Sequence, residues 1–250
     1  MKQMLRVLVV MVAVFFLATA PSAMGASRCD GLPTKGQLQA HLVNAAAGTG
    51  ISGPLGPGTG AGGLFGGTRM WGAVVNRDGE LCAFVTSTTD PTQTWPGSQA
   101  IAKAKAYTAN AFSNELVPLS TARLYTLSQP GHSLFGLNNS NPFHSHVLAP
   151  PSGSGGGNGQ IAGGIITFGG GVPLYDAGGE IIGGLGVSGD TACADHEIAK
   201  RVRDLAGLNP GGGPLADDIV YTAVDGASLF AHPLCVNTLR NGVFLGNEAP

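Results

Sequence analysis

Residues 171–205 read GVPLYDAGGEIIGGLGVSGDTACADHEIAKRVRDL and predict a β-hairpin followed by a helix. Segments 172–175 and 180–187 flank the turn Asp176-Ala177-Gly178-Gly179, which indicates two antiparallel strands. From Cys193 to Leu205 the apolar residues recur at helical spacing, so we expect a helix with one buried face. This stripe consists of Ile198, Ala199, Val202, Leu205 and Ala206. Gly207 ends the predicted helix.

An earlier part of the chain has the same order of hairpin and helix. Residues 71–75 and 81–85 are predicted strands around Asn76-Arg77-Asp78-Gly79, and Asp-Gly is a strong signal for a tight turn. Residues 99–114 are rich in alanine and predict a helix whose small side chains allow close contact with a sheet. We expect Lys103 and Lys105 to extend into solvent at the edge of this helix.

The remaining segments complete an α+β layout. Residues 32–47 predict a first helix, in which Thr34 and Gln37 form a capping-box pattern. Residues 48–67 and 128–160 are rich in Gly and Pro and predict long loops. Residues 208–250 are interpreted as a C-terminal tail. Because hairpins pair antiparallel, we expect one antiparallel sheet covered by helices rather than a doubly wound parallel sheet.

The N-terminus has the pattern of a cleavable signal peptide over residues 1–25. Lys2 and Arg6 precede an apolar run over residues 7–20, which is shorter than the roughly 20 residues of a membrane-spanning helix. Ala23-Met24-Gly25 supplies small residues for cleavage after Gly25. We therefore expect a secreted or periplasmic protein, with no membrane span in the mature chain.

Charge and composition restrict the choice of partner. Without Lys2 and Arg6 the chain has 11 basic and 15 acidic side chains, a net charge of −4, and it contains no basic run. Nucleic acid is therefore excluded as an expected partner, because its binding depends on clustered Lys and Arg. Glycine accounts for 41 of 250 residues and charged residues for 11%, a composition that fits loops and contacts between subunits.

Four cysteines, at positions 29, 82, 193 and 235, predict two disulfides in an exported chain. Their spacing contains no CxxC pair, which argues against a zinc ribbon or a thioredoxin-like motif. Four cysteines allow three pairings, and the spacing does not choose among them.

Two glycine motifs match known sites only in part. Residues 184–189 fit G-x-G-x-x-G, but no βαβ strand follows, and Asp204 falls inside a predicted helix instead of at a strand end. Residues 186–190 resemble a nucleophile elbow, except that Asp190 stands where glycine is required. We therefore predict neither a dinucleotide site nor an esterase site, and no catalytic constellation.

The histidines are the next candidates for a binding site. His144 and His146 would share one side of an extended strand and so could ligate a metal, although two solvated loop histidines are the interpretation we favour. His132 lies in a similar loop, and His196 is expected at the surface. Tyr107 and Tyr175 could ligate haem iron, but packing is the more frequent role of a tyrosine.

Three segments together resemble the GlcG/HbpS-like haem-binding family. They are residues 71–84, 96–112 and 168–199, with Lys-Ala-Tyr-Thr-Ala at 105–109 and Gly-Val-Ser-Gly-Asp-Thr at 186–191 as the most specific parts. The resemblance covers roughly residues 32–206. It implies a profilin-like antiparallel sheet of about five strands with helices packed on it, a family domain over residues 26–207, and assembly into a homo-oligomer.

The resemblance also implies a function. Extracytoplasmic members bind haem or a related tetrapyrrole and are linked to redox sensing, whereas cytosolic members lie beside glycolate or propanediol metabolism. We therefore expect an exported protein that sequesters or senses haem or iron. The alternatives are an enzyme that degrades haem or acts on a small metabolite, and a structural exported oligomer. The family has no agreed catalytic motif to transfer to this chain.

Within the haem-binding interpretation, the predicted ligands are His132, His144 and His146, because loops often carry function and imidazole is a common haem ligand. Lys105 is the predicted partner of a haem propionate. The topology that the resemblance implies suggests disulfides between Cys29 and Cys82 and between Cys193 and Cys235.

Overall fold

The computed structural model describes residues 28–148 and 155–249, so the predicted signal peptide lies outside the described residues. Both predicted hairpins are present. The first consists of β1 (Trp71–Asn76) and β2 (Leu81–Thr86), and the second of β3 (Gly171–Tyr175) and β4 (Ile181–Ser188). In the described residues they form one antiparallel sheet with the strand order β2-β1-β4-β3.

This sheet has four strands, whereas the resemblance implied about five. In the described part of the chain, the other strands form two small separate pairs. They are β5 (Val220–Tyr221) with β6 (Ala231–His232), and β7 (Thr238–Arg240) with β8 (Val243–Gly246). The α+β architecture with antiparallel pairing is therefore confirmed, but the strand count is not.

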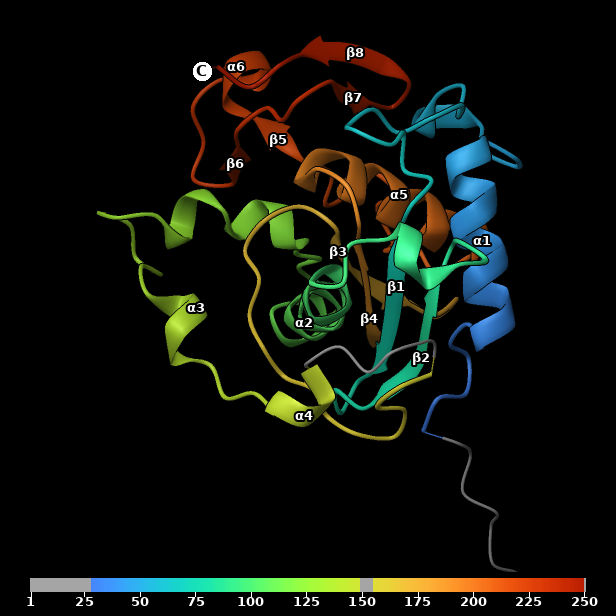
Figure 1. Cartoon of the computed structure of the whole chain (residues 1–250). Coiled ribbons are helices and arrows are strands. Elements are labelled where there is room, and N and C mark those ends of the chain that lie inside the picture. Colours follow the sequence, from blue (N-terminus) through green and yellow to red (C-terminus); the bar gives the residue numbers. More distant parts are fainter. Residues whose placement is uncertain (1–27, 149–154, 250) are drawn as a thin grey trace, which may run out of the picture.

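Helices cover both faces of the sheet (Figure 1). Helix α2 (Ser98–Ala111) lies on one face, and α1 (Lys35–Ala47) and α5 (Ala192–Leu205) lie on the other. Short helices α3 (Leu137–Ser140), α4 (Ser145–Leu148) and α6 (Thr222–Asp225) belong to the loops and the C-terminal segment. Because each strand alternates its side chains between the two faces, the sheet contributes to a separate apolar core on each side.

Helix α1 begins and ends as its sequence predicts. The Thr34 side chain accepts a hydrogen bond from Gln37 N, and the Gln37 side chain accepts one from Thr34 N, so the capping box is complete. Gly48 ends the helix with φ 74°, a left-handed conformation that glycine adopts without strain. The Cys29–Cys82 disulfide joins the segment before α1 to β2.

Helix α2 lies directly against the backbone of β4. A Cβ atom added at Gly184 would clash with the carbonyl oxygen of Ala106. A Cβ atom added at Gly186 would clash with the carbonyl oxygen of Ala102 and come within 2.5 Å of Ala106 N. The small residues of the predicted helix and the glycines of the strand thus permit one close contact between backbones.

Lys103 and Lys105 do not extend into solvent as the helical pattern suggested, because both side chains are fully buried. The Lys103 ammonium donates to the carbonyl of Val147 in α4 at 2.8 Å and lies 4.3 Å from the centre of the Phe84 ring. Burial lowers the pKa of Lys103 to about 8.

His196 was expected at the surface but is only 1% exposed, because residues 208–249 cover α5.

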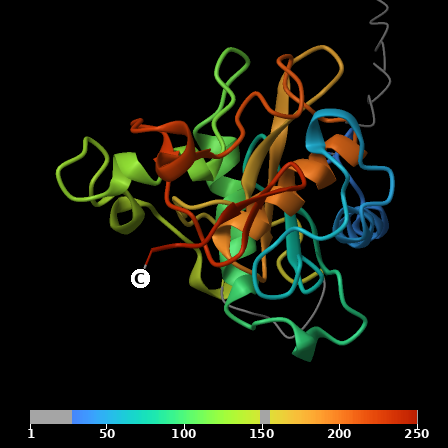
Figure 2. The ribbon, with the colours of Figure 1, turned by 90° about the horizontal axis from the view of Figure 1, so that it is seen from above.

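Residues 208–249 pack across α5 instead of extending from the domain (Figure 2). The Cys193–Cys235 disulfide fastens this C-terminal segment to the start of α5. Ala122, Ile219 and Tyr221 surround the disulfide in a small core of their own. Both disulfides thus have the pairing that the implied topology suggested. None of the helices in the described ranges is long and apolar enough to cross a membrane.

We predict that Gly186→Ala lowers the free energy of unfolding by about 2 kcal/mol or more, because the methyl group forces α2 away from β4. Gly36→Ala is the matched control, since no atom lies within 4 Å of an added Cβ there; its effect should range from neutral to about 1 kcal/mol of stabilisation. Urea denaturation measures both. A Gly186→Ala variant as stable as the wild type would show that the close contact is not needed.

The buried Lys103 ammonium predicts a pH dependence of stability. Between pH 8 and 10.5 the unfolded chain holds a proton on this lysine that the folded chain has lost, so unfolding should become less favourable as the pH rises. The difference in unfolding free energy between the wild type and Lys103→Met should therefore change by up to about 1.4 kcal/mol per pH unit in this window. Denaturant titrations from pH 7 to 9.5 test this, and a constant difference would contradict it.

Candidate functional site

A surface pocket of about 210 Å³ lies between α2 and the segment that leads into α4. Its lining residues are Tyr107, Pro142, Phe143, His144, Ile161, Ala162 and Gly163, and we refer to it as the Tyr107–His144 pocket. Phe143 and Ile161 are 63% and 46% exposed, respectively. The pocket therefore offers accessible apolar surface together with a phenol and an imidazole.

Backbone pairing holds the two sides of this pocket together. His144 N donates to the carbonyl of Ala162 at 2.8 Å, and Phe143 forms an isolated antiparallel bridge with Gly163. Gly163 has φ 67°, and a side chain there would clash with the carbonyl of Pro142. Glycine is therefore required where the two segments meet.

The fold positions Tyr107 and α4 as well. A Cβ at Gly79, in the turn between β1 and β2, would lie 2.8 Å from the Tyr107 ring, so this turn packs against the phenol. The bond from Lys103 to Val147 holds α4 against α2. Gly79, Gly163 and the buried Lys103 thus help to position the walls of the pocket.

His144 and His146 lie close together, with ring centroids 6.0 Å apart. They do not lie on an extended strand, which was the arrangement considered for a metal pair: His144 directly precedes α4, His146 lies within it, and both residues are exposed. His144 lines the pocket together with Tyr107. Imidazole and phenolate are both axial ligands of haem iron, so the two residues fit an iron-containing ligand.

His132 lies in a different pocket, of about 440 Å³, which also contains Thr126, Thr222 and Leu229. Much of its wall belongs to the C-terminal segment. The structure therefore does not bring the three predicted histidines to one site.

Lys105 lies inside the protein and lines neither of these pockets. Its ammonium donates to Asp195 Oδ2 at 2.7 Å and to the carbonyl of Val187 at 3.0 Å. Burial raises the pKa of Asp195 to about 6 and lowers that of Lys105, and the attraction between the two groups opposes both shifts. A fully enclosed ammonium with a carboxylate partner is not available to a haem propionate at the surface.

Tyr175, the other candidate tyrosine, has a packing role. Its hydroxyl donates to the carbonyl of Asn114 at 2.7 Å, and only 1% of the residue is exposed. Burial is the main cause that raises its pKa to about 12, which disfavours the phenolate that iron would require.

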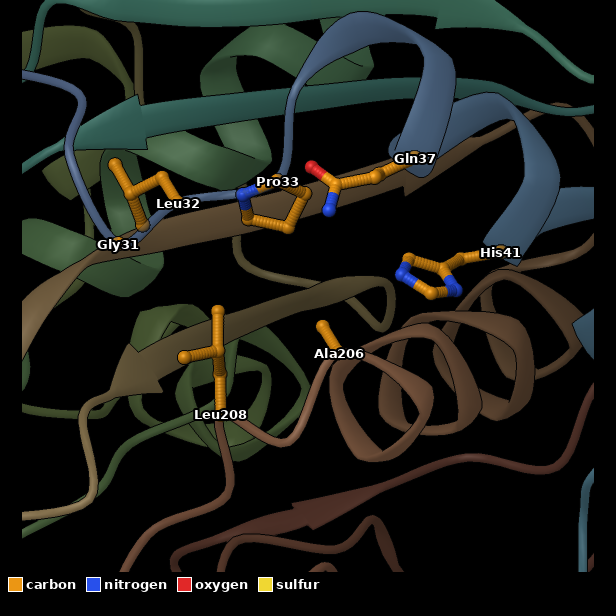
Figure 3. A pocket seen from close by; sticks show the side chains of 7 residues that line it. All are labelled: Gly31, Leu32, Pro33, Gln37, His41, Ala206 and Leu208. Carbon is orange, nitrogen blue, oxygen red and sulfur yellow. The ribbon is translucent and has the colours of Figure 1, made fainter.

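A smaller pocket of about 80 Å³ lies between the start of α1 and the residues that follow α5 (Figure 3). Gln37 and His41 from α1 face Ala206 and Leu208 across it. Its volume is well below the roughly 300 Å³ of small ligand pockets, so it is a poor site for a ligand of haem size.

The sequence indicates His144 and Tyr107 as candidate ligands, but it gives no signal for the apolar walls at Phe143 and Ile161. Residues 128–160 have no periodicity that could indicate which side chains face a pocket. The pairing of residues 142–144 with residues 161–164 brings these walls together, and it has no local signal in the sequence.

Comparisons with known proteins agree with the resemblance. Residues 65–204, more than half of the chain, match the family model described as "Haem degrading protein HbpS-like". No curated protein matches the chain.

Several solved structures are similar. Klebsiella pneumoniae protein ORFY is 23% identical, with a TM-score of 0.45 over 69% of this chain and 88% of that one. A PduOC–haem complex is 24% identical, with a TM-score of 0.45 over 70% and 92%. HbpS is 18% identical, with a TM-score of 0.42 over 78% and 98%. On the extent of the family match, this chain belongs to the HbpS-like family.

Proposed function

We propose that this protein binds haem in the Tyr107–His144 pocket. One observation carries the proposal: every residue that lines this pocket lies within residues 65–204, which match a family described by its relation to haem. The His132 pocket, in contrast, is formed in part by residues 222–229, outside that match.

The chemistry of the pocket supports the assignment. Phe143 and Ile161 offer apolar surface to a flat macrocycle, and burial of such surface favours binding. His144 or Tyr107 would supply an axial ligand from the protein, and His146 lies beside His144 as a second imidazole. Bound haem would supply an iron centre for ligand exchange or redox chemistry, and these residues would hold and orient it.

The size of the pocket suggests an open site. Its volume of about 210 Å³ is below the roughly 300–1,000 Å³ of pockets that enclose small molecules, so one edge or face of a haem would stay uncovered. We infer that a second copy of the chain covers this face, in the homo-oligomer that the resemblance implies. Sedimentation with and without haem measures this association.

We also propose that the protein is exported from the cytosol. The basic and apolar pattern of residues 1–25 and the two disulfides support folding outside the cytosol. In that location the protein would sequester or sense haem.

Haem degradation is the second candidate function, and the description of the family favours it. Tyr107 and His144 are the titratable side chains that line the pocket. Binding and degradation differ in the fate of the haem: a binding protein leaves the Soret band intact over hours with a reductant and oxygen, whereas an enzyme converts it to the absorbance of a ring-opened product.

We predict a saturable Soret shift when haem is added to the purified protein. Replacement of both histidines, His144→Ala with His146→Ala, should weaken haem binding at least about tenfold, because the imidazole ligands are lost. Tyr107→Phe should change the shape of the band if the phenolate is a ligand. Absorbance titration of each variant measures both effects.

His132→Ala is the matched control, since it removes an imidazole from the other pocket and should leave the affinity unchanged. Equal affinity of the wild type, the double histidine variant and Tyr107→Phe would remove haem from this pocket. No Soret shift with the wild type would instead favour the structural role.

A further inference from the structure

The C-terminal segment forms a further pocket, of about 470 Å³, with residues 125–126. Tyr125, Leu234 and Glu248 are among its lining residues, and we refer to it as the Tyr125–Glu248 pocket. Among the described residues, it has no lining residue in common with the Tyr107–His144 pocket. Figure 1 shows the C-terminal segment at the opposite end of the molecule from α4, so the two pockets are separate.

Hydrogen bonds hold two walls of this pocket in place. On one side, Thr126 Oγ1 donates to the carbonyl of Ala231 at 2.6 Å, which fastens residues 125–126 to β6. On the other side, Glu248 N donates to the carbonyl of Cys235 at 3.0 Å, and the disulfide of Cys235 fixes this part of the chain to α5. The fold therefore builds the pocket from segments that are fixed to one another.

The Tyr125–Glu248 pocket continues into the pocket that contains His132. The two have Thr126 and Thr222 in common, so they form one groove. The second part, of about 440 Å³, adds the apolar side chains of Ala227 and Leu229, and Leu229 is 57% exposed. Each volume lies in the range of roughly 300–1,000 Å³ that is typical of sites for small molecules.

Charge restricts the class of ligand that this groove can take. In the part of the chain that the structure describes, Glu248 is the one Asp, Glu, Lys or Arg that lines it, and no ion pair there neutralises the Glu248 carboxylate. The guanidinium of Arg240, which reaches α6, donates instead to both oxygens of Asp225, at 2.6 and 3.0 Å. A negatively charged ligand would therefore meet like charge in the groove, whereas a cation would pair with Glu248.

Tyr125 adds an aromatic ring to the carboxylate in the same pocket. The face of an aromatic ring attracts an ammonium group, so a ring and a carboxylate together form a site for an organic cation. From this position the rest of the ligand would face Leu234 and, beyond Thr222, Leu229. Contact of an apolar tail with these side chains removes apolar surface from water and favours binding.

We propose that this groove binds an amphipathic organic cation, with the ammonium head beside Tyr125 and Glu248 and the apolar tail along Leu229. Its unpaired carboxylate, its aromatic ring and its apolar walls together select this class of ligand. The proposal goes beyond haem binding and does not depend on it. Most residues that line the groove lie outside residues 65–204, so the groove is not part of the region that matches the family.

Calorimetric titration of the protein with decyltrimethylammonium, below the concentration at which it forms micelles, tests the proposal. We expect saturable binding of about one ligand per chain. Decyl sulfate has the same tail with a negative head, and it should bind at least about tenfold more weakly, because Glu248 repels it. Butyltrimethylammonium should also bind at least about tenfold more weakly, because its shorter tail buries less apolar surface.

Variants assign the two ends of the ligand to the groove. Glu248→Gln should weaken the binding of decyltrimethylammonium at least about threefold and reduce the preference for it over decyl sulfate. Glu180→Gln is the matched control, because it removes an exposed carboxylate from the turn between β3 and β4, outside the groove. Leu229→Ser should lower the affinity for the decyl compound and leave that for the butyl compound unchanged.

Three results would each overturn the proposal. They are no saturable binding by the wild type, equal affinity for decyl sulfate, and the same affinity in Glu248→Gln as in Glu180→Gln. An unchanged decyl affinity in Leu229→Ser would overturn the placement of the tail. Circular dichroism of each variant shows that a loss of affinity is not a loss of fold, since Glu248 and Leu229 are both exposed.

Discussion

The close contact between α2 and β4 is the constraint on which the rest of the structure depends. The helix backbone passes directly over Gly184 and Gly186, where any side chain would meet carbonyl oxygens of the helix. This contact fixes the position of α2 on the sheet. Side chains from its other faces can then reach only particular partners, so Lys103 meets α4 and Lys105 meets α5. A contact between backbones thereby determines where two buried charges lie.

Buried charges in turn hold the glycine-rich loops, which have few apolar side chains of their own. Arg201 on α5 donates to the carbonyls of Ala45, Gly58 and Gly60, and so fastens the end of α1 and the loop after it. The Asp190 carboxylate accepts from the backbone of residues 64, 65 and 67 in the same loop. Such groups are costly to bury unless they are fully paired, so each specifies one position for its loop.

The proposed haem site depends on this framework. The Tyr107–His144 pocket lies where two irregular segments pair beside α2, and its lining residues Phe143 and Ile161 expose apolar surface to solvent. At the start of α5, in contrast, the C-terminal segment covers the Cys193–Cys235 disulfide with a small apolar core. The open face of the pocket is what suits it to a large flat molecule.

The sequence by itself determined both hairpins, the three long helices and the resemblance to the family, because turn residues, capping residues and apolar periodicity act over a few positions. It also indicated His144 and Tyr107 as candidate ligands without indicating that they share a pocket. Only the tertiary structure decided that Lys103, Lys105 and His196 are buried and that His232 meets the cysteines. Burial and proximity depend on segments that are distant in the chain, such as α4 above Lys103 and the C-terminal segment above α5, and no local pattern encodes these contacts.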